Sequence, residues 1–211
     1  LAWEAAYQRF ETPEEEIAKF TRRLHRLGAR EWARSQRVVE IFCGRGNGLH
    51  SWASLGYSRL IGVDYSHRLL KEYDGPGYLA CGDCRAVPLP DECADIVAVQ
   101  GGLHHLRILP DDLIRTLDQV CRILTPGGRF LVVEPWRTPF LTAVHVVSEW
   151  APARRAWHKV DAFAAMTAHE RPTYENWLSR PDEILALITD RFVTERLRTR
   201  WGKLEMTCIR R

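Results

Sequence analysis

The chain has 211 residues, 45% of them hydrophobic and 27% charged, with a formal net charge of +3. These values are ordinary for a folded domain, so they exclude a disordered or fibrous chain. The small net charge does not by itself indicate a nucleic-acid partner, and we expect none.

No run of about 18 apolar residues is present, so we expect no membrane span. The opening stretch, LAWEAAYQRFETPEEE, lacks the basic and apolar parts of a secretory signal. Six cysteines, several of them within apolar runs, are expected to be reduced and buried. We therefore expect a cytoplasmic protein; nothing in the sequence indicates its oligomeric state.

The first predicted element is a helix that begins after Thr12. Pro13 and the acidic residues 14–16 suit a first helical turn, and apolar residues then recur every three or four positions as far as Gly28. A second short helix is expected to include Trp32. Residues 1–36 are therefore predicted to form an N-terminal helical cap.

Residues 37–135 alternate short apolar runs with helical patterns. The runs RVVEIF, RLIGVD, GYLACGD, ADIVAVQ and GRFLVVE read as strands, and helical patterns such as DLIRTLDQVCRIL separate them. Strands that alternate with helices indicate a parallel sheet with right-handed crossovers. The predicted fold class is α/β: a doubly wound, Rossmann-like, mostly parallel sheet of seven strands.

The pattern changes after Glu134. Residues 136–189, rich in tryptophan and other aromatic residues, are predicted to form a helical insertion before the last two strands. Residues 190–211 are predicted to form those strands, about Phe192 to Arg200 and Lys203 to Ile209, joined at Trp201-Gly202. All these segments are expected to belong to a single domain.

The segment VVEIFCGRGNG carries the strongest motif. A buried strand ends near Glu40, and glycines at 44, 46 and 48 then open a helix, which lets the backbone approach a ligand closely. Asp64 ends the next strand, where it can reach a ribose diol. Two carboxylates at successive strand ends indicate a ligand that contains a nucleoside.

A nicotinamide dinucleotide is the first rival ligand. Its G-x-G-x-x-G fingerprint, counted from Gly44, would need a third glycine where Leu49 stands. Glu40 would also repel a pyrophosphate but attract an ammonium group. The residues therefore favour a cationic ligand with an amino-acid end.

Residues 37–135 resemble the class I S-adenosylmethionine-dependent methyltransferases, particularly the small-molecule (type 11) group that includes quinone-biosynthesis enzymes. The resemblance rests on four ordered motifs: VVEIFCGRGNG, IGVDYS, CGDCRAVPLPDECADIVAVQGGLHHL and LTPGGRFLVVEP. It implies S-adenosylmethionine as the cofactor. One departure is Phe42, which stands where family members usually have glycine, so the course of the loop at the methionine end is open.

The resemblance also implies a site. Glu40, Gly44 and Gly46 would line the methionine end, and Asp64 would bind the ribose. Tyr65 would lie on the adenine face, Asp83 would bind the adenine amino group, and Gln100 would approach the sulfonium. Phe42 and Cys84 complete the predicted cofactor site.

The expected catalytic residues are His104 and His105, just beyond the fourth strand, where a base for a hydroxyl acceptor would stand. They can equally shape the pocket without moving a proton. Trp136, His145 and Trp157 are predicted to contact the acceptor. No metal site is predicted.

The sequence thus predicts methyl transfer to an oxygen or nitrogen atom of a small molecule, such as a natural product or a glycan-linked or quinone-like compound. One alternative is a nucleic-acid methyltransferase, although the amino-methylating motif Asn-Pro-Pro-aromatic and the Pro-Cys nucleophile are absent. Another alternative is a protein that binds the cofactor without catalysis.

Overall fold

The computed structural model describes residues 9–211, and its first long helix is α2 (Pro13–Leu27). The Thr12 hydroxyl accepts a hydrogen bond from the Glu15 N–H, and the Glu15 carboxylate accepts one from the Thr12 N–H. This capping box fixes the start of the helix. Residues 1–8 of the predicted N-terminal cap lie outside the described residues.

The short second helix predicted around Trp32 is not formed, and the chain makes turns there instead. The Arg34 guanidinium donates hydrogen bonds to the carbonyl oxygens of Ala29 and Trp32, so those carbonyls are satisfied without a helix. Trp32 is buried all the same, with the Arg129 guanidinium over its ring. The apolar residue that suggested a helix is a core residue of a turn.

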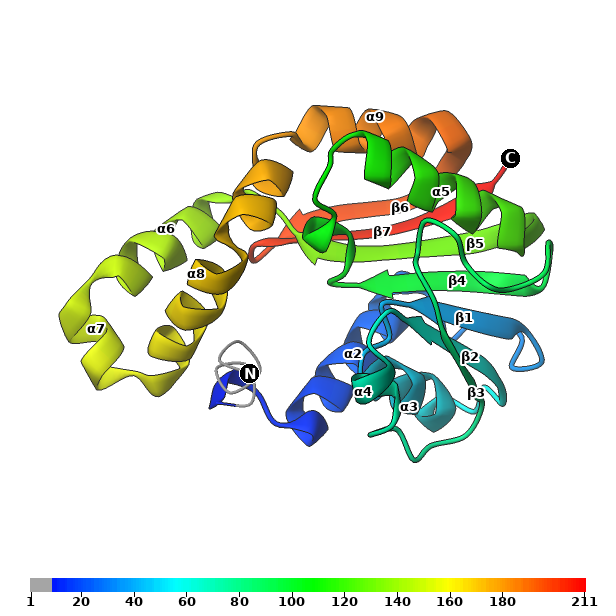
Figure 1. Ribbon diagram of the computed structural model, residues 1–211, viewed down its shortest axis with the longest axis horizontal. Helices are drawn as coiled ribbons and strands as arrows, with labels where there is room; N and C mark the ends of the chain where they lie inside the picture. The colour runs from blue at the N-terminus through cyan, green and yellow to red at the C-terminus, as the bar shows by residue number, and fades with distance from the viewer. Residues whose placement is uncertain (1–8) are drawn as a thin grey trace.

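A seven-stranded sheet in the order β3-β2-β1-β4-β5-β7-β6 forms the centre of the molecule (Figure 1). Strand β7 runs antiparallel to both of its neighbours, and the other pairs are parallel. The strands are β1 (Arg37–Ile41), β2 (Arg59–Asp64), β3 (Tyr78–Cys81), β4 (Ala94–Gln100), β5 (Leu124–Pro135), β6 (Phe192–Arg200) and β7 (Lys203–Arg210). The predicted Rossmann-like sheet is confirmed.

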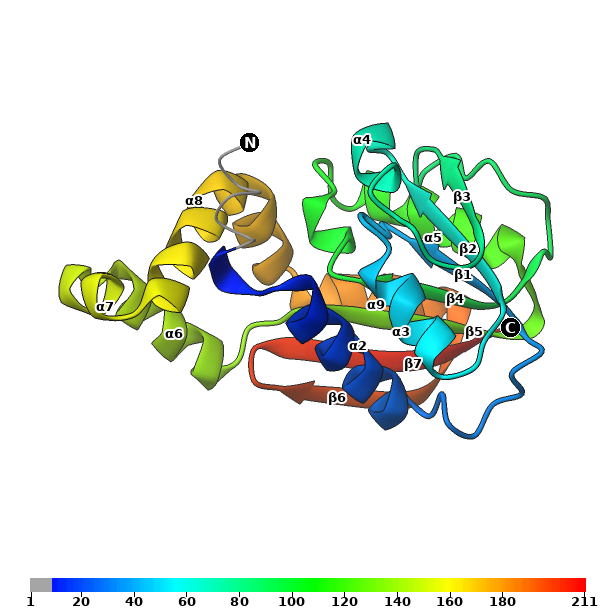
Figure 2. The ribbon, with the colours of Figure 1, turned by 90° about the horizontal axis from the view of Figure 1, so that it is seen from below.

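Helices cover both faces of this sheet (Figure 2). Helices α2 and α3 (Asn47–Ser54) lie on one face, and α5 (Asp111–Ile123) and α9 (Pro181–Arg191) lie on the other. Each face has its own apolar core: Leu24 and Trp52 belong to the first, and Leu117 and Ile188 to the second. The arrangement is the doubly wound one predicted from the alternating pattern.

The last two strands form a hairpin at Trp201 and Gly202. Both residues have positive φ angles, 52° and 72°. A two-residue turn of this kind matches the right-handed twist of the paired strands. The predicted reversal at this dipeptide is therefore observed.

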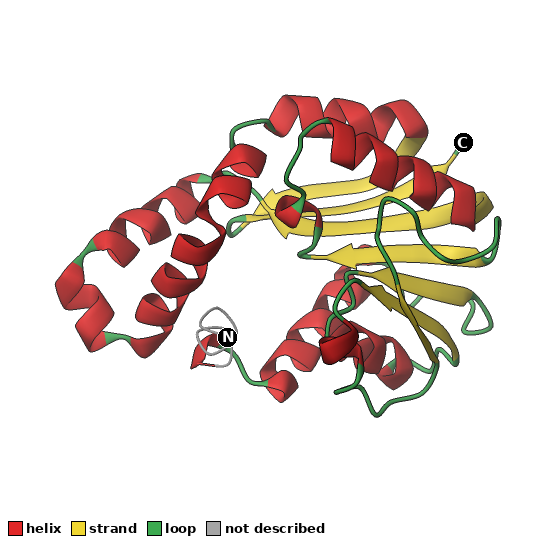
Figure 3. Ribbon diagram, in the orientation of Figure 1, coloured by secondary structure: helices red, strands yellow, loops and turns green. Residues whose placement is uncertain are grey.

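Three helices follow β5: α6 (Pro139–Glu149), α7 (Ala151–Ala156) and α8 (His158–Leu178). They project beyond the carboxyl end of β5, away from the sheet (Figure 3). The Trp177 indole N–H donates to the Pro135 carbonyl oxygen at 2.9 Å, which fastens the end of α8 to the end of β5. No helix within residues 9–211 is long and apolar enough to cross a bilayer.

Candidate functional site

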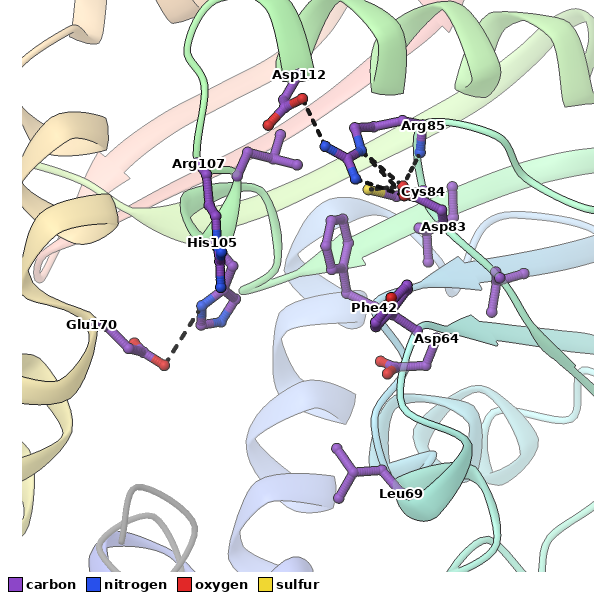
Figure 4. A pocket seen from close by; sticks show the side chains of 15 residues that line it. Phe42, Asp64, Leu69, Asp83, Cys84, Arg85, His105, Arg107, Asp112 and Glu170 are labelled. Carbon is purple, nitrogen blue, oxygen red and sulfur yellow. Dashed lines mark hydrogen bonds and ion pairs between the residues drawn. The ribbon is translucent and has the colours of Figure 1, made fainter. Parts of the chain in front are cut away.

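A cavity of about 710 Å³ opens where the carboxyl ends of β1 and β2 meet the loop after β3, the short helix η1 (Leu103–His105) and α8 (Figure 4). Ligands of open parallel sheets bind at this edge. Among the described lining residues, the predicted site residues are Phe42, Asp64, Tyr65, Asp83, Cys84 and His105. Residues from several of the sequence motifs thus line one cavity.

Glu40 is buried beside this edge, with 2% of its surface exposed. Its Oε2 atom has no hydrogen-bond partner among the described residues, and neither polar atom of the Gln100 amide has one. Burial raises the pKa of Glu40 to about 8, and the nearby Gln100 offsets only part of this effect. A buried carboxylate with one unpartnered oxygen suits a ligand ammonium group, so this pair of residues fits the methionine end of the expected cofactor.

The glycine loop gives Glu40 its place. A Cβ atom at Gly48 would lie 1.8 Å from the Glu40 Oε1 atom, so the carboxylate occupies the space that glycine leaves open. Gly44 and Gly46 have φ angles of 54° and 80°, and Gly46 precedes the first residue of α3. Gly44 and Gly46 thus shape the turn, while Gly48 makes room for the acid.

Asp64 lies at the end of β2 and faces the cavity (Figure 4). Its Oδ2 atom accepts the Gly44 N–H and its Oδ1 atom accepts the Ser66 N–H, each at 2.8 Å. An ionised carboxylate has about four acceptor positions, so two remain for the hydroxyls of a ribose. The neighbouring Tyr65 ring is 80% exposed and open to stack on a base.

Asp83 is held by Arg85, a residue that the sequence analysis did not predict to belong to the site. The Arg85 guanidinium pairs with both Asp83 oxygens and also donates to Asp112 Oδ1 at 2.9 Å. These hydrogen bonds lower the pKa of Asp83 to about 2. The loop after β3 is thereby tied to the start of α5, and Cys84 is placed on the cavity wall as a free thiol.

Phe42 takes up the left-handed conformation, with a φ angle of 60°. This conformation is rare for a bulky residue and favours glycine. The Phe42 ring packs over Gly102, where a Cβ atom would lie 2.2 Å from the ring. The loop therefore keeps the glycine-type course, and the ring becomes part of the cavity wall.

His104 is buried and held by Glu134, which lies at the end of β5. The Nδ1 atom of His104 lies 2.7 Å from Glu134 Oε2, and Glu134 Oε1 accepts the N–H groups of Gly102 and Leu103. Burial opposes ionisation of Glu134, but the His104 and backbone hydrogen bonds outweigh it and lower its pKa. The one sign of Glu134 in the sequence is an acid that ends an apolar strand.

His105 faces the cavity and lies opposite Glu170 of α8 (Figure 4). The His105 Nδ1 atom is 3.5 Å from Glu170 Oε1, and the His104 Nε2 atom is 3.7 Å from Glu170 Oε2. Burial, followed by the neighbouring His104, lowers the pKa of His105 to about 4. No local pattern in the sequence pointed to Glu170, because α8 brings it in from a distant part of the chain.

The three residues predicted to contact the acceptor lie apart from this cavity lining. Trp136 is buried and packs edge-on against Trp177, so it belongs to the core. Trp157 is 66% exposed between α7 and α8. His145 lies 3.3 Å from the Tyr174 hydroxyl, and the Tyr174 ring in turn lies edge-on to His104. Only His145 is linked to the site, through one intervening ring.

Residues 39–132 match a protein-family model described as a methyltransferase domain. The ubiquinone/menaquinone biosynthesis C-methyltransferase UbiE of Acidiphilium cryptum is 27% identical over 168 residues, which are 72% of this chain and 64% of that protein. The tRNA U34 carboxymethyltransferase of Vibrio vulnificus is 35% identical over 109 residues, 47% of this chain and 32% of that protein. The chain thus spans less than two thirds of the length of these curated relatives.

A solved structure has the same fold. The N-methyltransferase NodS from Bradyrhizobium japonicum, in complex with S-adenosylhomocysteine, superposes with a TM-score of 0.62 at 15% identity. The match covers 96% of this chain and 98% of the other. One of these relatives acts in ubiquinone and menaquinone biosynthesis and another on U34 of tRNA, so the expectation against nucleic acid is not supported.

Proposed function

We propose that this chain, which belongs to the class I S-adenosylmethionine-dependent methyltransferases, transfers the methyl group of that cofactor to an oxygen or nitrogen atom of a small molecule. One observation carries the proposal. Asp64 and Asp83 lie on one side of the cavity, and His105 and Glu170 lie on the other (Figure 4). A cofactor on the first side and an acceptor on the second would share one cavity.

Glu40 and Gln100 are proposed to hold the methionine end. The free Oε2 atom of Glu40 and the unpaired Gln100 amide support this role, because an ammonium group would neutralise the Glu40 carboxylate and donate hydrogen bonds to Glu40 Oε2 and Gln100 Oε1. Asp64 is proposed to bind the ribose hydroxyls through its two remaining acceptor positions. The backbone N–H groups of Gly44 and Ser66 hold the Asp64 carboxylate in place before any ligand arrives.

The adenine end is proposed to lie along the loop after β3. Asp83 and Cys84 line the cavity there, and Tyr65 offers an exposed ring. Arg85 holds the Asp83 carboxylate in its ionised state, so Asp83 can accept a hydrogen bond from an exocyclic amino group. Phe42 forms the wall between this loop and the β1 end.

The bound cofactor supplies a methyl group that is activated by its sulfonium leaving group. The protein's part is to align the acceptor and to exclude water. His105 is proposed to contact the acceptor, because it lines the cavity. His104 is proposed to position its neighbour, since its Nδ1 atom is engaged by Glu134.

Helix α8 is proposed to be the part of the aromatic segment that meets the acceptor. Its Glu170 carboxylate reaches the cavity, and its Tyr174 packs against His104 and links it to His145. In this proposal neither tryptophan contacts the acceptor: the buried Trp136 stabilises the fold of the aromatic segment, and Trp157 lies on the outer surface of that segment.

Turnover of a panel of acceptors tests the proposal. Formation of S-adenosylhomocysteine is followed with phenols, amines, carboxylic acids and sugars, and also with unmodified tRNA because of the tRNA-directed relative. We expect turnover with a small molecule, and we expect His105→Gln to lower it about 100-fold with cofactor affinity unchanged. Turnover with tRNA and with none of the small molecules would overturn the proposed small-molecule acceptor in favour of a nucleic acid. Cofactor binding without any turnover would support the non-catalytic alternative.

A further inference from the structure

The imidazoles of His104 and His105 and the carboxylate of Glu170 form a cluster that the cofactor site does not use. One ring nitrogen of each histidine and one carboxylate oxygen of Glu170 all lie within 4.8 Å of one another. The two histidines come from η1 and the glutamate comes from α8. Figure 4 shows Glu170 pointing across the gap toward His105. The cluster therefore joins two elements at one point of the cavity wall.

The spacing within the cluster differs from that of ordinary hydrogen bonds. An N–H···O bond spans about 2.7 to 3.2 Å between its heavy atoms. The two imidazole nitrogens lie 3.7 Å and 3.5 Å from the nearer Glu170 oxygens. Ligand atoms about 2.0 to 2.1 Å from a tetrahedral zinc ion are separated by about 3.3 Å. These two distances, each to a different oxygen of Glu170, are closer to the ligand separation of a coordination site than to the mode of a hydrogen bond.

Glu134 supplies the outer support that such a site needs. A carboxylate can only accept, so the 2.7 Å contact places a proton on His104 Nδ1 and leaves Nε2 directed at Glu170. Histidines that bind metals commonly donate their other ring N–H to a carboxylate in this way. Glu134 is itself fixed by two backbone N–H groups and is fully buried.

The negative charges around His104 also favour a bound metal ion. Glu134, which is buried, and Glu170, which is partly buried, place two carboxylates around one buried imidazole, and negative charges withdrawn from water need a positive partner. A proton on the imidazole supplies one positive charge, whereas a divalent ion between neutral imidazoles supplies two. The dication balances both carboxylates.

We propose that His104, His105 and Glu170 bind one divalent transition-metal ion, most suitably Zn²⁺, whose open coordination position faces the cavity. Two imidazoles and one carboxylate form a ligand set of catalytic zinc sites, in which water or substrate takes the fourth position. Glu170 and His105 both line the cavity, so that position opens toward the acceptor. This inference rests on the proposed function for its use: the ion would bind an oxygen atom of the acceptor and ease the loss of its proton.

Calorimetric titration of metal-free protein with zinc sulfate tests the site directly. We expect one Zn²⁺ per chain in the wild type and an affinity lower by about tenfold or more in His105→Gln and Glu170→Gln. Matched controls are His169→Gln and Glu175→Gln, exposed residues of the same helix α8, which should leave the affinity unchanged. Failure of the wild type to bind Zn²⁺, or equal losses in the controls, would overturn the proposal.

Two further measurements keep the test decisive. The visible spectrum of the Co²⁺-loaded wild type needs no variant: a four- or five-coordinate spectrum supports the site, and a six-coordinate spectrum like that of aqueous Co²⁺ overturns it. Binding of S-adenosylhomocysteine, measured in the same samples, separates the two proposals. Its absence in a wild type that binds Zn²⁺ would refute the proposed function and leave the metal site standing.

Discussion

Glu40 is the residue at which stability and binding oppose each other. Burial without a described partner for Oε2 costs the protein free energy whenever the carboxylate is ionised. The same lack of a partner is what prepares the site for a cationic ligand. Ionisation of Glu40 is therefore unfavourable in the ligand-free fold, and a ligand ammonium group would make it favourable.

Stability should therefore depend on pH through Glu40. Its pKa is about 8 in the folded state against an ordinary value of 4.5, so between these values the folded protein keeps a proton that the unfolded chain has lost. The free energy of unfolding then falls as pH rises, by at most about 1.4 kcal/mol per pH unit from this group. We expect Glu40→Gln to be more stable than wild type at pH 8 and similar to it at pH 4.5.

Urea unfolding of the ligand-free proteins at several pH values between 4.5 and 8 measures this gap. The control is the same series with S-adenosylhomocysteine, which should stabilise the wild type more than the variant because of its ammonium group. A stability difference that stays constant over the whole pH range would contradict the assignment of the ionisation to Glu40.

Asp64 gives the second prediction at this scale. Asp64→Ala should weaken S-adenosylhomocysteine binding by about tenfold or more, because a charge-assisted ribose contact contributes about 1.5 to 3 kcal/mol. Asp64→Asn should lose less if one acceptor bond survives. Calorimetry measures both, with the exposed Asp74→Ala as the control. An affinity of Asp64→Ala within twofold of wild type would rule out the ribose role.

Among the elements, those with a strong local pattern were predictable. The capping residues at Thr12 and the Trp201-Gly202 hairpin were found because short-range chemistry alone decides them. The segment at Trp32 was mispredicted because Arg34, a side chain nearby, satisfies the carbonyls that a helix would use. The course of the loop at Phe42 was open from the sequence, since propensity alone does not show that a phenylalanine keeps a φ angle of 60°.

The loop between β1 and α3 provides a prediction for an element. Gly48→Ala would place a Cβ atom against the Glu40 carboxylate and should destabilise the protein by about 1 to 3 kcal/mol. In a Glu40→Ala background the collision is gone, and Gly48→Ala should be neutral or stabilising, because alanine favours a helix over glycine by about 1 kcal/mol. A double-mutant cycle by urea unfolding measures the coupling. Additive effects, within about 0.5 kcal/mol, would show that the two side chains do not meet.

At the scale of the whole molecule, the sheet and the meeting of Asp64, Asp83 and His105 at one cavity could be predicted, but the carboxylates that pair with the two histidines could not. Parallel strands bring their carboxyl ends to one edge by topology, so Asp64 and Asp83 were placed from the motif order. The pairs His104–Glu134 and His105–Glu170 join residues far apart in the chain. Their meeting depends on how β5 and α8 pack, and a single sequence carries no sign of that contact.

The cofactor assignment predicts how the whole fold responds to ligands. S-adenosylhomocysteine at about 100 times its dissociation constant should add about 2.7 kcal/mol to the free energy of unfolding. For a domain of this size that corresponds to a rise in Tm of roughly 5 to 10 °C. NADH should give no comparable rise, because its pyrophosphate would meet the buried Glu40 carboxyl group at the glycine loop, and this group offers an anion no positive partner. Differential scanning calorimetry with each ligand measures the two shifts.

The Asp64→Ala variant is the control, since it should lose most of the S-adenosylhomocysteine effect while its ligand-free melting can be recorded separately. A larger shift with NADH than with S-adenosylhomocysteine would reverse the choice of cofactor and, with it, the roles given to Glu40 and Asp64.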